Sequence, residues 1–197
     1  MYGQMTANDD ELWERAAGGD VDAFGALFSR HAPAVRAFCL RRTADPAAAD
    51  DLTSIVFLET WRRRADVHIE ADAMRAWLLG VAVNLLRGHW RSRRRHAAAL
   101  ARLRVEPVAY DETDRAGERL DAAARLRAAR DALTGLRREE RDVLTLVAWG
   151  ELDYEGVAVA LGIPVGTVRS RLARARRRLR EHPSLAPANI SEEGGQT

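Results

Sequence analysis

The segment from Val165 to Arg180 constrains the fold most, because its apolar and charged residues separate at helical spacing. Val168, Leu172, Ala175 and Leu179 recur at i, i+4, i+7 and i+11, which is one stripe of an α-helix. The remaining positions are rich in arginine and contain no acid: Arg169, Arg171, Arg174, Arg176, Arg177, Arg178 and Arg180. Such a helix can pack its stripe on a small domain and offer its other faces to a polyanion.

The residues just before this helix predict a second, shorter helix and a tight turn. Tyr154, Val157, Ala158 and Leu161 form an apolar seam, and Gly162 supplies the turn. Ala158 and Gly162 are small, so the two helices can cross closely, as in a helix-turn-helix whose second helix enters the DNA major groove. Thr167 and Ser170 lie where such side chains reach bases or phosphates. An ordinary helical hairpin with a basic surface is the weaker interpretation.

Charge is distributed unevenly along the 197 residues, although the formal net charge is only +2. All 31 basic residues are arginine, whose planar guanidinium suits phosphates and guanine edges. Residues 87–104 hold seven of them and no acid, whereas residues 106–121 hold six acids. Two basic blocks separated by an acidic stretch indicate two nucleic-acid contacts joined by a linker.

The apolar pattern predicts an all-α chain with two helical domains joined by a flexible linker, the second domain containing the helix-turn-helix. A hydrophobic content of 47% is enough for real cores, and no strand-like alternation occurs. The predicted domains are residues 9–97 and 122–182, with an acidic linker at 98–121 and a disordered tail at 183–197. The predicted helices cover residues 9–18, 23–42 (bent or restarted at Pro33), 46–64, 73–96, 122–133, 137–149 and 154–161, before the arginine-rich helix.

Two helices of the first domain carry more than a core requires. Phe57 and Trp61 are i, i+4 neighbours in a helix with unusually wide apolar character, so they form either core or a partner-binding ridge; the pattern alone favours core. The helix over 73–96 turns basic in its second half, where arginines alternate with His89 and Trp90. Basic residues also complement a helix C-terminus, but this many arginines with an aromatic favour contact with nucleic acid.

Enzymatic signatures are missing from the sequence. The five histidines form no metal-binding pair, the single cysteine cannot build a zinc site, and no glycine-rich phosphate loop occurs. We therefore expect no metal, no cofactor and no catalysis. Cys39 lies in an apolar context typical of a core thiol, and a lone cysteine suits a reducing cytosol. The N-terminus has no signal-peptide pattern and the apolar runs are too short for a bilayer, so we expect a cytoplasmic protein without a membrane partner.

Several motifs, in this order, resemble bacterial extracytoplasmic-function (ECF) sigma factors, the two-domain minimal type of RNA polymerase sigma subunit. In the first domain these are residues 22–28, 49–61 and 75–85 and the triplet Arg93 to Arg95; in the second they are residues 136–144 and 162–176. The resemblance covers nearly the whole chain except the termini and the linker. It implies core RNA polymerase and promoter DNA as partners, and it leaves an anti-sigma factor open as a further one.

The resemblance also implies roles for particular residues. The helix from Asp51 to Trp61 resembles the segment that grips the clamp helices of the largest polymerase subunit, with Asp51, Leu52, Phe57 and Trp61 as contacts. The helix over 73–95 resembles the segment that binds and opens the −10 element, with Asn84, Arg87, Trp90 and Arg91 as contacts. The helix-turn-helix resembles the reader of the −35 element, with Thr167, Arg169, Ser170, Arg171 and Arg174 facing DNA. The acidic linker would follow the path towards the RNA exit.

Three positions depart from the family pattern. Ser54 and Ile55 stand where Gln-Glu is common, Val83 where Arg is usual, and Gly88 where Asp is common. The main alternative function is a helix-turn-helix regulator, similar to a response-regulator output domain, that does not replace a sigma subunit. It would need a ligand-binding or phosphoacceptor module in the first domain, and no such pattern is present there. A structural RNA-binding protein with little sequence preference is a third class.

Overall fold

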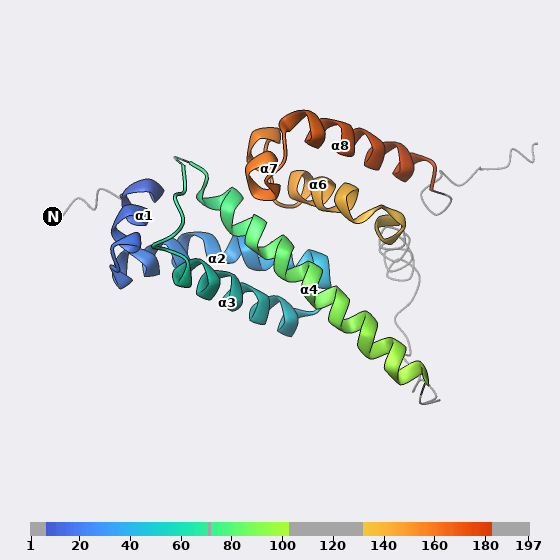
Figure 1. Ribbon diagram of the computed structural model, residues 1–197, viewed down its shortest axis with the longest axis horizontal. Helices are drawn as coiled ribbons and strands as arrows, with labels where there is room; N and C mark the ends of the chain where they lie inside the picture. The colour runs from blue at the N-terminus through green and yellow to red at the C-terminus, as the bar shows by residue number, and fades with distance from the viewer. Residues whose placement is uncertain (1–6, 71, 103–131, 183–197) are drawn as a thin grey trace, which may run out of the picture. The chain divides into compact units, whose positions relative to one another are not determined.

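The computed structural model describes residues 7–70, 72–102 and 132–182, and the regular elements in these ranges are all helical (Figure 1). They are α1 (Asp9–Ala17), α2 (Val21–Thr43), α3 (Pro46–Arg62), α4 (Met74–Arg102), α6 (Arg138–Ala148), α7 (Tyr154–Leu161) and α8 (Val165–Arg180), and residues 132–135 are also helical. The predicted all-α class is confirmed. Contacts divide the chain into two compact units, residues 1–108 with 145–168 and residues 109–144 with 169–197. Because this division passes through α6 and α8, it does not test the predicted domain bounds, which stay predictions.

The first three helices begin at side chains that cap their free backbone N–H groups. Asn8, Asp20 and Asp45 each accept a hydrogen bond from the N–H three residues further on, at 2.8, 3.0 and 3.1 Å. Pro46 at the first position of α3 has no N–H to satisfy there. The bond from the backbone, together with one from Arg15, holds the pKa of Asp20 below its ordinary value. These caps explain why the helix starts were readable from the sequence.

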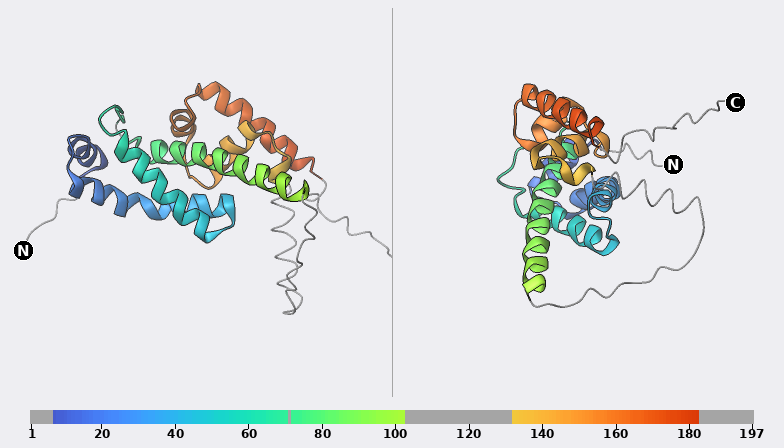
Figure 2. Two further views of the ribbon diagram at one scale, coloured as in Figure 1. Left: turned by 60° about the horizontal axis from the view of Figure 1, so that its bottom comes forward. Right: turned by 90° about the vertical axis from the view of Figure 1, so that its right-hand side faces the viewer.

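The core of the α1–α4 bundle lies around α2, which packs against α1, α3 and α4, while α3 also packs against α4. Helix α2 continues through Pro33 and does not restart there. The largest fully buried side chains of the core are Leu27, Val35 and Phe38 from α2, Val56 from α3, and Leu78, Leu79, Val83 and Leu86 from α4. The C-terminal part of α4 extends beyond α2 and α3 (Figures 1 and 2). Arg91 and Arg95 are exposed there.

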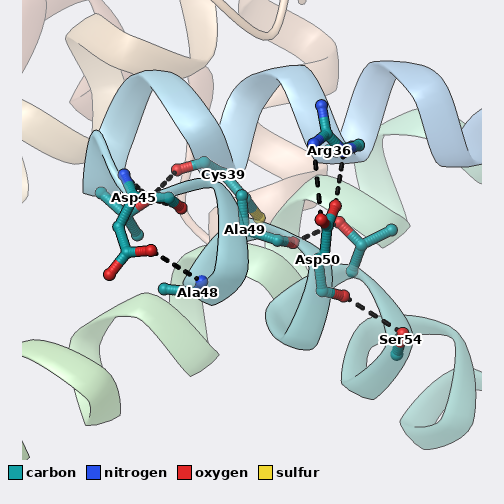
Figure 3. A network of polar contacts seen from close by, with 9 residues as sticks. Arg36, Cys39, Asp45, Ala48, Ala49, Asp50 and Ser54 are labelled. Carbon is teal, nitrogen blue, oxygen red and sulfur yellow. Dashed lines mark hydrogen bonds and ion pairs between the residues drawn. The ribbon is translucent and has the colours of Figure 1, made fainter.

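The junction between α2 and α3 is held by the polar contacts in Figure 3. Arg36 on α2 forms an ion pair with Asp50 on α3, and this pairing raises the pKa of Arg36. Cys39 is fully buried beside them, and burial raises the pKa of its thiol to about 11. The prediction of a core thiol is therefore confirmed. Asp50 is therefore engaged in an ion pair between the two helices.

The predicted helix-turn-helix is present in α7 and α8. Asp153 caps α7 by accepting the N–H of Gly156 at 2.7 Å. At the other end, Gly162 has φ of +62°, a left-handed conformation that an L side chain disfavours. The N–H of Ile163 then bonds to the carbonyl of Ala158 at 3.1 Å, which closes the helix end, and α8 begins two residues later.

One helix boundary was predicted wrongly. The helix expected to end at residue 96 continues as α4 to Arg102, so residues 98–102 of the predicted linker are helical. An alanine-rich and arginine-rich stretch favours the helix locally, which the choice of a linker boundary neglected. Residues 103–121 of the linker, 122–131 of the next predicted helix and the 183–197 tail lie outside the described residues.

Candidate nucleic-acid interface

The second helix of the helix-turn-helix, α8, buries one stripe and exposes the rest. Val168, Leu172 and Ala175 are at most 2% exposed, as the spacing predicted, whereas Leu179 is only partly buried. Among the predicted −35 contacts, Arg169, Ser170 and Arg174 are exposed, while Thr167 and Arg171 are partly buried. The arginines of α8 lie on either side of this buried apolar stripe. Arg169, Arg176 and Arg180 lie on one flank, Arg171, Arg174 and Arg178 lie on the other, and Arg177 lies outermost between them.

The flank with Arg174 and Arg178 faces acids of α6. The carboxylate of Glu140 lies 3.8 Å from Nε of Arg174 and 3.5 Å from Nε of Arg178, and its side chain is only 3% exposed. The same carboxylate accepts the backbone N–H of Arg137 at 3.2 Å, at the start of α6. Figure 1 shows α6 beside α8. Arg174 is therefore held by a buried acid, whereas the sequence suggested a side chain committed to DNA.

A second acid of α6 lies next to Glu140 and near the same flank. The pKa of Glu139 is below its ordinary value, chiefly because its own backbone N–H bonds to the carboxylate. The side chain of Arg138, 3.1 Å away, and the charge of Arg171 lower it further. Three arginines on this flank of α8 thus face two carboxylates. By contrast, the structure pairs neither Arg176 nor Arg180 with an acid within its described ranges.

The basic half of α4 presents a polar face. Asn84 and Arg91 are exposed and lie two helical turns apart on the same side, and Arg95 continues that line. Arg87 is partly buried and donates a hydrogen bond to the side-chain oxygen of Asn84 at 3.0 Å. The structure thus brings three of the four predicted −10 residues together on one face. Trp90 is partly buried on an adjacent face, where its ring meets His89 edge-on at 6.0 Å.

A hydrophobic groove opens between the beginning of α2 and the end of α3. It has a volume of about 420 Å³ and is lined by Val21, Phe24, Phe28, Ser54, Phe57, Leu58 and Trp61. The aromatic rings pack against one another: the ring centroids of Phe28 and Phe57 lie 4.7 Å apart, and those of Phe24 and Trp61 lie 5.0 Å apart. Leu58 is 61% exposed and Phe28 is 43% exposed at its rim. We call this the α2–α3 groove.

The four residues predicted to bind the polymerase are not equivalent. Asp51 is exposed, but Leu52 and Phe57 are only 6% and 4% exposed, so they are mainly core residues and cannot form an outer ridge. Their role as direct partner contacts stays a prediction, and Phe57 lines the α2–α3 groove. Trp61 is partly buried, and the guanidinium of Arg64 lies 4.1 Å from its ring centroid.

Sequence reasoning missed Glu140 and the rim of the groove. An acid at the third position of a helix is a known capping signal, so residues 137–140 could have drawn attention to Glu140. Exposed Leu58 lies off the buried stripe of α3, and this mismatch was the available signal for the rim. The contribution of Val21, Phe24 and Phe28 could not be read from α3 alone.

No helix of the described ranges is long and apolar enough to cross a membrane. In the same part of the chain, no group of three or more histidine, cysteine or acidic side chains is arranged to hold a metal ion.

Two family models match the chain in order along its length. Sigma-70 region 2 matches residues 27–96, which include most of α2, α3 and the basic half of α4 up to residue 96. Sigma-70 region 4 matches residues 126–179, which include α6, α7 and nearly all of α8. The fold and these matches define a helical DNA-binding protein of the sigma-70 type.

Curated relatives narrow this class. SigL of Mycobacterium tuberculosis, an ECF RNA polymerase sigma factor, is 33% identical over 168 residues, covering 84% of this chain and 91% of SigL. BldN of Streptomyces coelicolor, another ECF RNA polymerase sigma factor, is 31% identical over 171 residues, covering 86% of this chain and 63% of BldN. The chain therefore spans less than two thirds of BldN but nearly all of SigL. It belongs to the ECF family of RNA polymerase sigma factors.

Solved structures agree with this fold. CnrH, determined in complex with the cytosolic domain of CnrY, superposes with a TM-score of 0.63 at 25% identity, covering 88% of this chain and 95% of CnrH. The sigma factor RpoE of Bartonella quintana, determined in complex with the anti-sigma factor NepR, gives a TM-score of 0.59 at 25% identity, covering 85% of this chain and all of RpoE.

Proposed function

We propose that this protein is a transcription initiation factor that binds core RNA polymerase and directs it to promoters with −10 and −35 elements. The observation that carries the proposal is the presence of three different surfaces on one chain in the family's order. These are the α2–α3 groove, the polar face of α4 and the arginine-rich α8. A DNA-binding regulator would need only the last of them.

The α2–α3 groove is the proposed polymerase contact. Its lining is almost wholly apolar, and Leu58, Phe28 and Val21 expose large side chains at it. Exposed apolar surface of this kind is stabilised when a partner covers it. In ECF sigma factors this segment grips the clamp helices of the largest subunit, and a helix is a suitable shape for a groove between two helices. Asp51 on the exposed side of α3 supplies a polar contact at the edge.

The face of α4 is the proposed −10 contact. Opening a duplex requires the capture of an unstacked base, for which polar and aromatic side chains are suited. Asn84 with its hydrogen-bonded Arg87 offers a donor and acceptor pair, and exposed Arg91 offers a phosphate contact. Trp90 is partly buried beside them and supplies an aromatic surface for stacking.

The N-terminal half of α8 is the proposed −35 reader. Arg169 and Ser170 are exposed in its first turns, next to partly buried Thr167 and Arg171. Changing Arg171 to alanine should reduce discrimination between −35 sequences by about 1–3 kcal/mol if its guanidinium makes a bidentate base contact. An equal loss on all sequences would instead make Arg171 a phosphate contact.

We propose no catalytic step for this chain itself, because the polymerase performs the chemistry. We place the action of this protein in the cytoplasm, where the polymerase and the promoter are. An anti-sigma factor is a further proposed partner, supported by the complex in which RpoE was determined with the anti-sigma factor NepR.

The test is transcription in vitro from genomic DNA with purified core polymerase, with and without the full-length chain, followed by mapping of start sites. We expect discrete starts that depend on the chain and share two upstream motifs. A folded chain that binds DNA but yields no new starts would support the regulator alternative and contradict the proposal.

A further inference from the structure

The two flanks of α8 differ in what their arginines face. Arg174 and Arg178 share a single carboxylate, that of Glu140, at 3.8 and 3.5 Å. Arg176 and Arg180, on the other flank, have no acidic partner among residues 7–70, 72–102 and 132–182. The arginines of α8 are therefore not equally available to DNA, although every charged residue of this helix is an arginine.

Burial strengthens the hold of Glu140 on these two arginines. The Glu140 side chain is 3% exposed, so water screens its charge poorly and its attraction for a nearby guanidinium is larger than at the surface. A buried carboxylate also needs a cation beside it, because ionisation without a partner is costly. The side chains of Arg174 and Arg178 are 50% and 36% exposed, so each has one side towards Glu140 and one side towards solvent.

Glu140 itself is fixed in place by the backbone. Its second oxygen accepts the N–H of Arg137, which is one of the free donors at the start of α6. Arg141, the next residue, bonds through its guanidinium to the carbonyls of Leu133, Thr134 and Leu136, at 2.7 to 3.0 Å. The start of α6 is thus tied to residues 133–136 just before it, and the Glu140 carboxylate cannot easily follow an arginine that moves away.

We propose that Glu140 is a positioning residue for DNA binding: it withholds Arg174 and Arg178 from phosphates, so that the phosphates of duplex DNA are contacted through Arg176 and Arg180 on the other flank. This inference deepens the proposed −35 function of α8 and names the residue that limits its binding to arbitrary DNA. It also changes the expected role of Arg174, from a base or phosphate contact to a side chain oriented by α6.

The consequence for affinity follows from the release of counterions. Each phosphate neutralised by an arginine adds about 0.9 to the slope of log affinity against log salt concentration. If Glu140→Gln frees both arginines for phosphates, the slope steepens by up to about 1.8. Between 50 and 200 mM salt, the ratio of variant to wild-type affinity then falls roughly 12-fold. Glutamine keeps the shape of the side chain and can still accept the N–H of Arg137.

The experiment measures binding of the full-length chain to a short fluorescent duplex of arbitrary sequence, across a range of salt concentrations. The matched control is Glu181→Gln, which removes the same charge from an exposed pair with Arg177 at 3.9 Å. We expect tighter binding and a steeper slope for Glu140→Gln, and a wild-type slope for Glu181→Gln. Equal slopes for the two variants would overturn the inference, because a change in net charge alone would then explain the data.

A second pair of variants keeps the test decisive if Glu140→Gln does not fold. Arg176→Gln and Arg178→Gln remove one arginine from each flank of the same helix. We expect Arg176→Gln to flatten the salt slope by about 0.9 and Arg178→Gln to flatten it much less. An equal or larger effect of Arg178→Gln would contradict the inference. Neither measurement uses polymerase or a promoter, so failure here is distinct from failure of the transcription test.

Discussion

Replacing Leu58 by alanine tests whether the α2–α3 groove is the polymerase contact. Leu58 is 61% exposed at the rim of the groove, so the free protein gains little from it. Full burial of a leucine side chain contributes about 1.5–3 kcal/mol, and covering the exposed part by a partner would contribute about 1–2 kcal/mol. The dissociation constant for core polymerase should therefore rise about 5- to 30-fold in the Leu58→Ala protein.

The choice of Leu58 separates binding from folding. Alanine and leucine both favour helices, and an exposed substitution changes stability by less than about 0.5 kcal/mol. Trp61→Ala would be less informative, because Trp61 also contacts the Phe24 ring and the Arg64 guanidinium. Val159→Ala, at a 49% exposed position on α7 that does not line the groove, is the control for a general loss of apolar surface.

The assay is equilibrium binding of the fluorescently labelled full-length chain to purified core polymerase, with helical content and thermal unfolding checked for each variant. We expect weaker binding for Leu58→Ala and unchanged binding for Val159→Ala. If Leu58→Ala binds as tightly as the wild type while folded, the groove is not the contact. If both variants weaken binding equally, the groove has no special role.

Three further predictions concern other parts of the chain. Arg91→Gln should leave promoter binding by the holoenzyme largely intact but reduce strand opening, measured by reactivity of unpaired thymines; normal opening would exclude Arg91 from the −10 contact. Gly162→Ala should lower the free energy of unfolding by about 1–2 kcal/mol, because φ is +62° at that position. Gly166→Ala should instead stabilise α8 by up to about 1 kcal/mol, because an added Cβ meets nothing within 4 Å there. Thermal unfolding measures both effects, and equal effects of the two substitutions would refute the argument. The pKa of Asp20 is lowered on folding, so its contribution to stability is present above its ordinary pKa near 3.8 and is lost as the pH falls through the pKa of the folded state. The difference in unfolding free energy between the wild type and Asp20→Ala should therefore shrink in acid. A difference that grows in acid would contradict this prediction.

Local signals predicted the helices well, because each depends on residues close in the chain. The Asp45–Pro46 start of α3 and the Gly162 turn both rest on backbone groups within a few residues. The extension of α4 to Arg102 was missed because composition was taken as the sign of a linker, although nothing in residues 97–102 breaks a helix.

The candidate site was less predictable, because its properties depend on which helices meet. Phe57 was assigned to either core or partner surface, and only the packing of α2 on α3 shows that it is the floor of a groove. In the same way, Arg174 and Arg176 look equivalent in the sequence. They differ because Glu140 lies on another helix, 34 positions before Arg174 in the chain, and faces only one flank of α8.

The restraint on α8 is consistent with how a sigma factor must find its site. A helix with every guanidinium free would bind any duplex through phosphates, and such binding carries no sequence information. Specificity is a ratio of affinities, so withdrawing two arginines from phosphates lowers the affinity for arbitrary DNA more than it lowers the contribution of base contacts. The lost affinity can be supplied elsewhere, since binding at α4 and at the polymerase makes the −35 contact effectively intramolecular. On this argument, a weaker but more selective α8 suits a chain that works within a complex, whereas a regulator acting alone would gain from keeping Arg174 and Arg178 free.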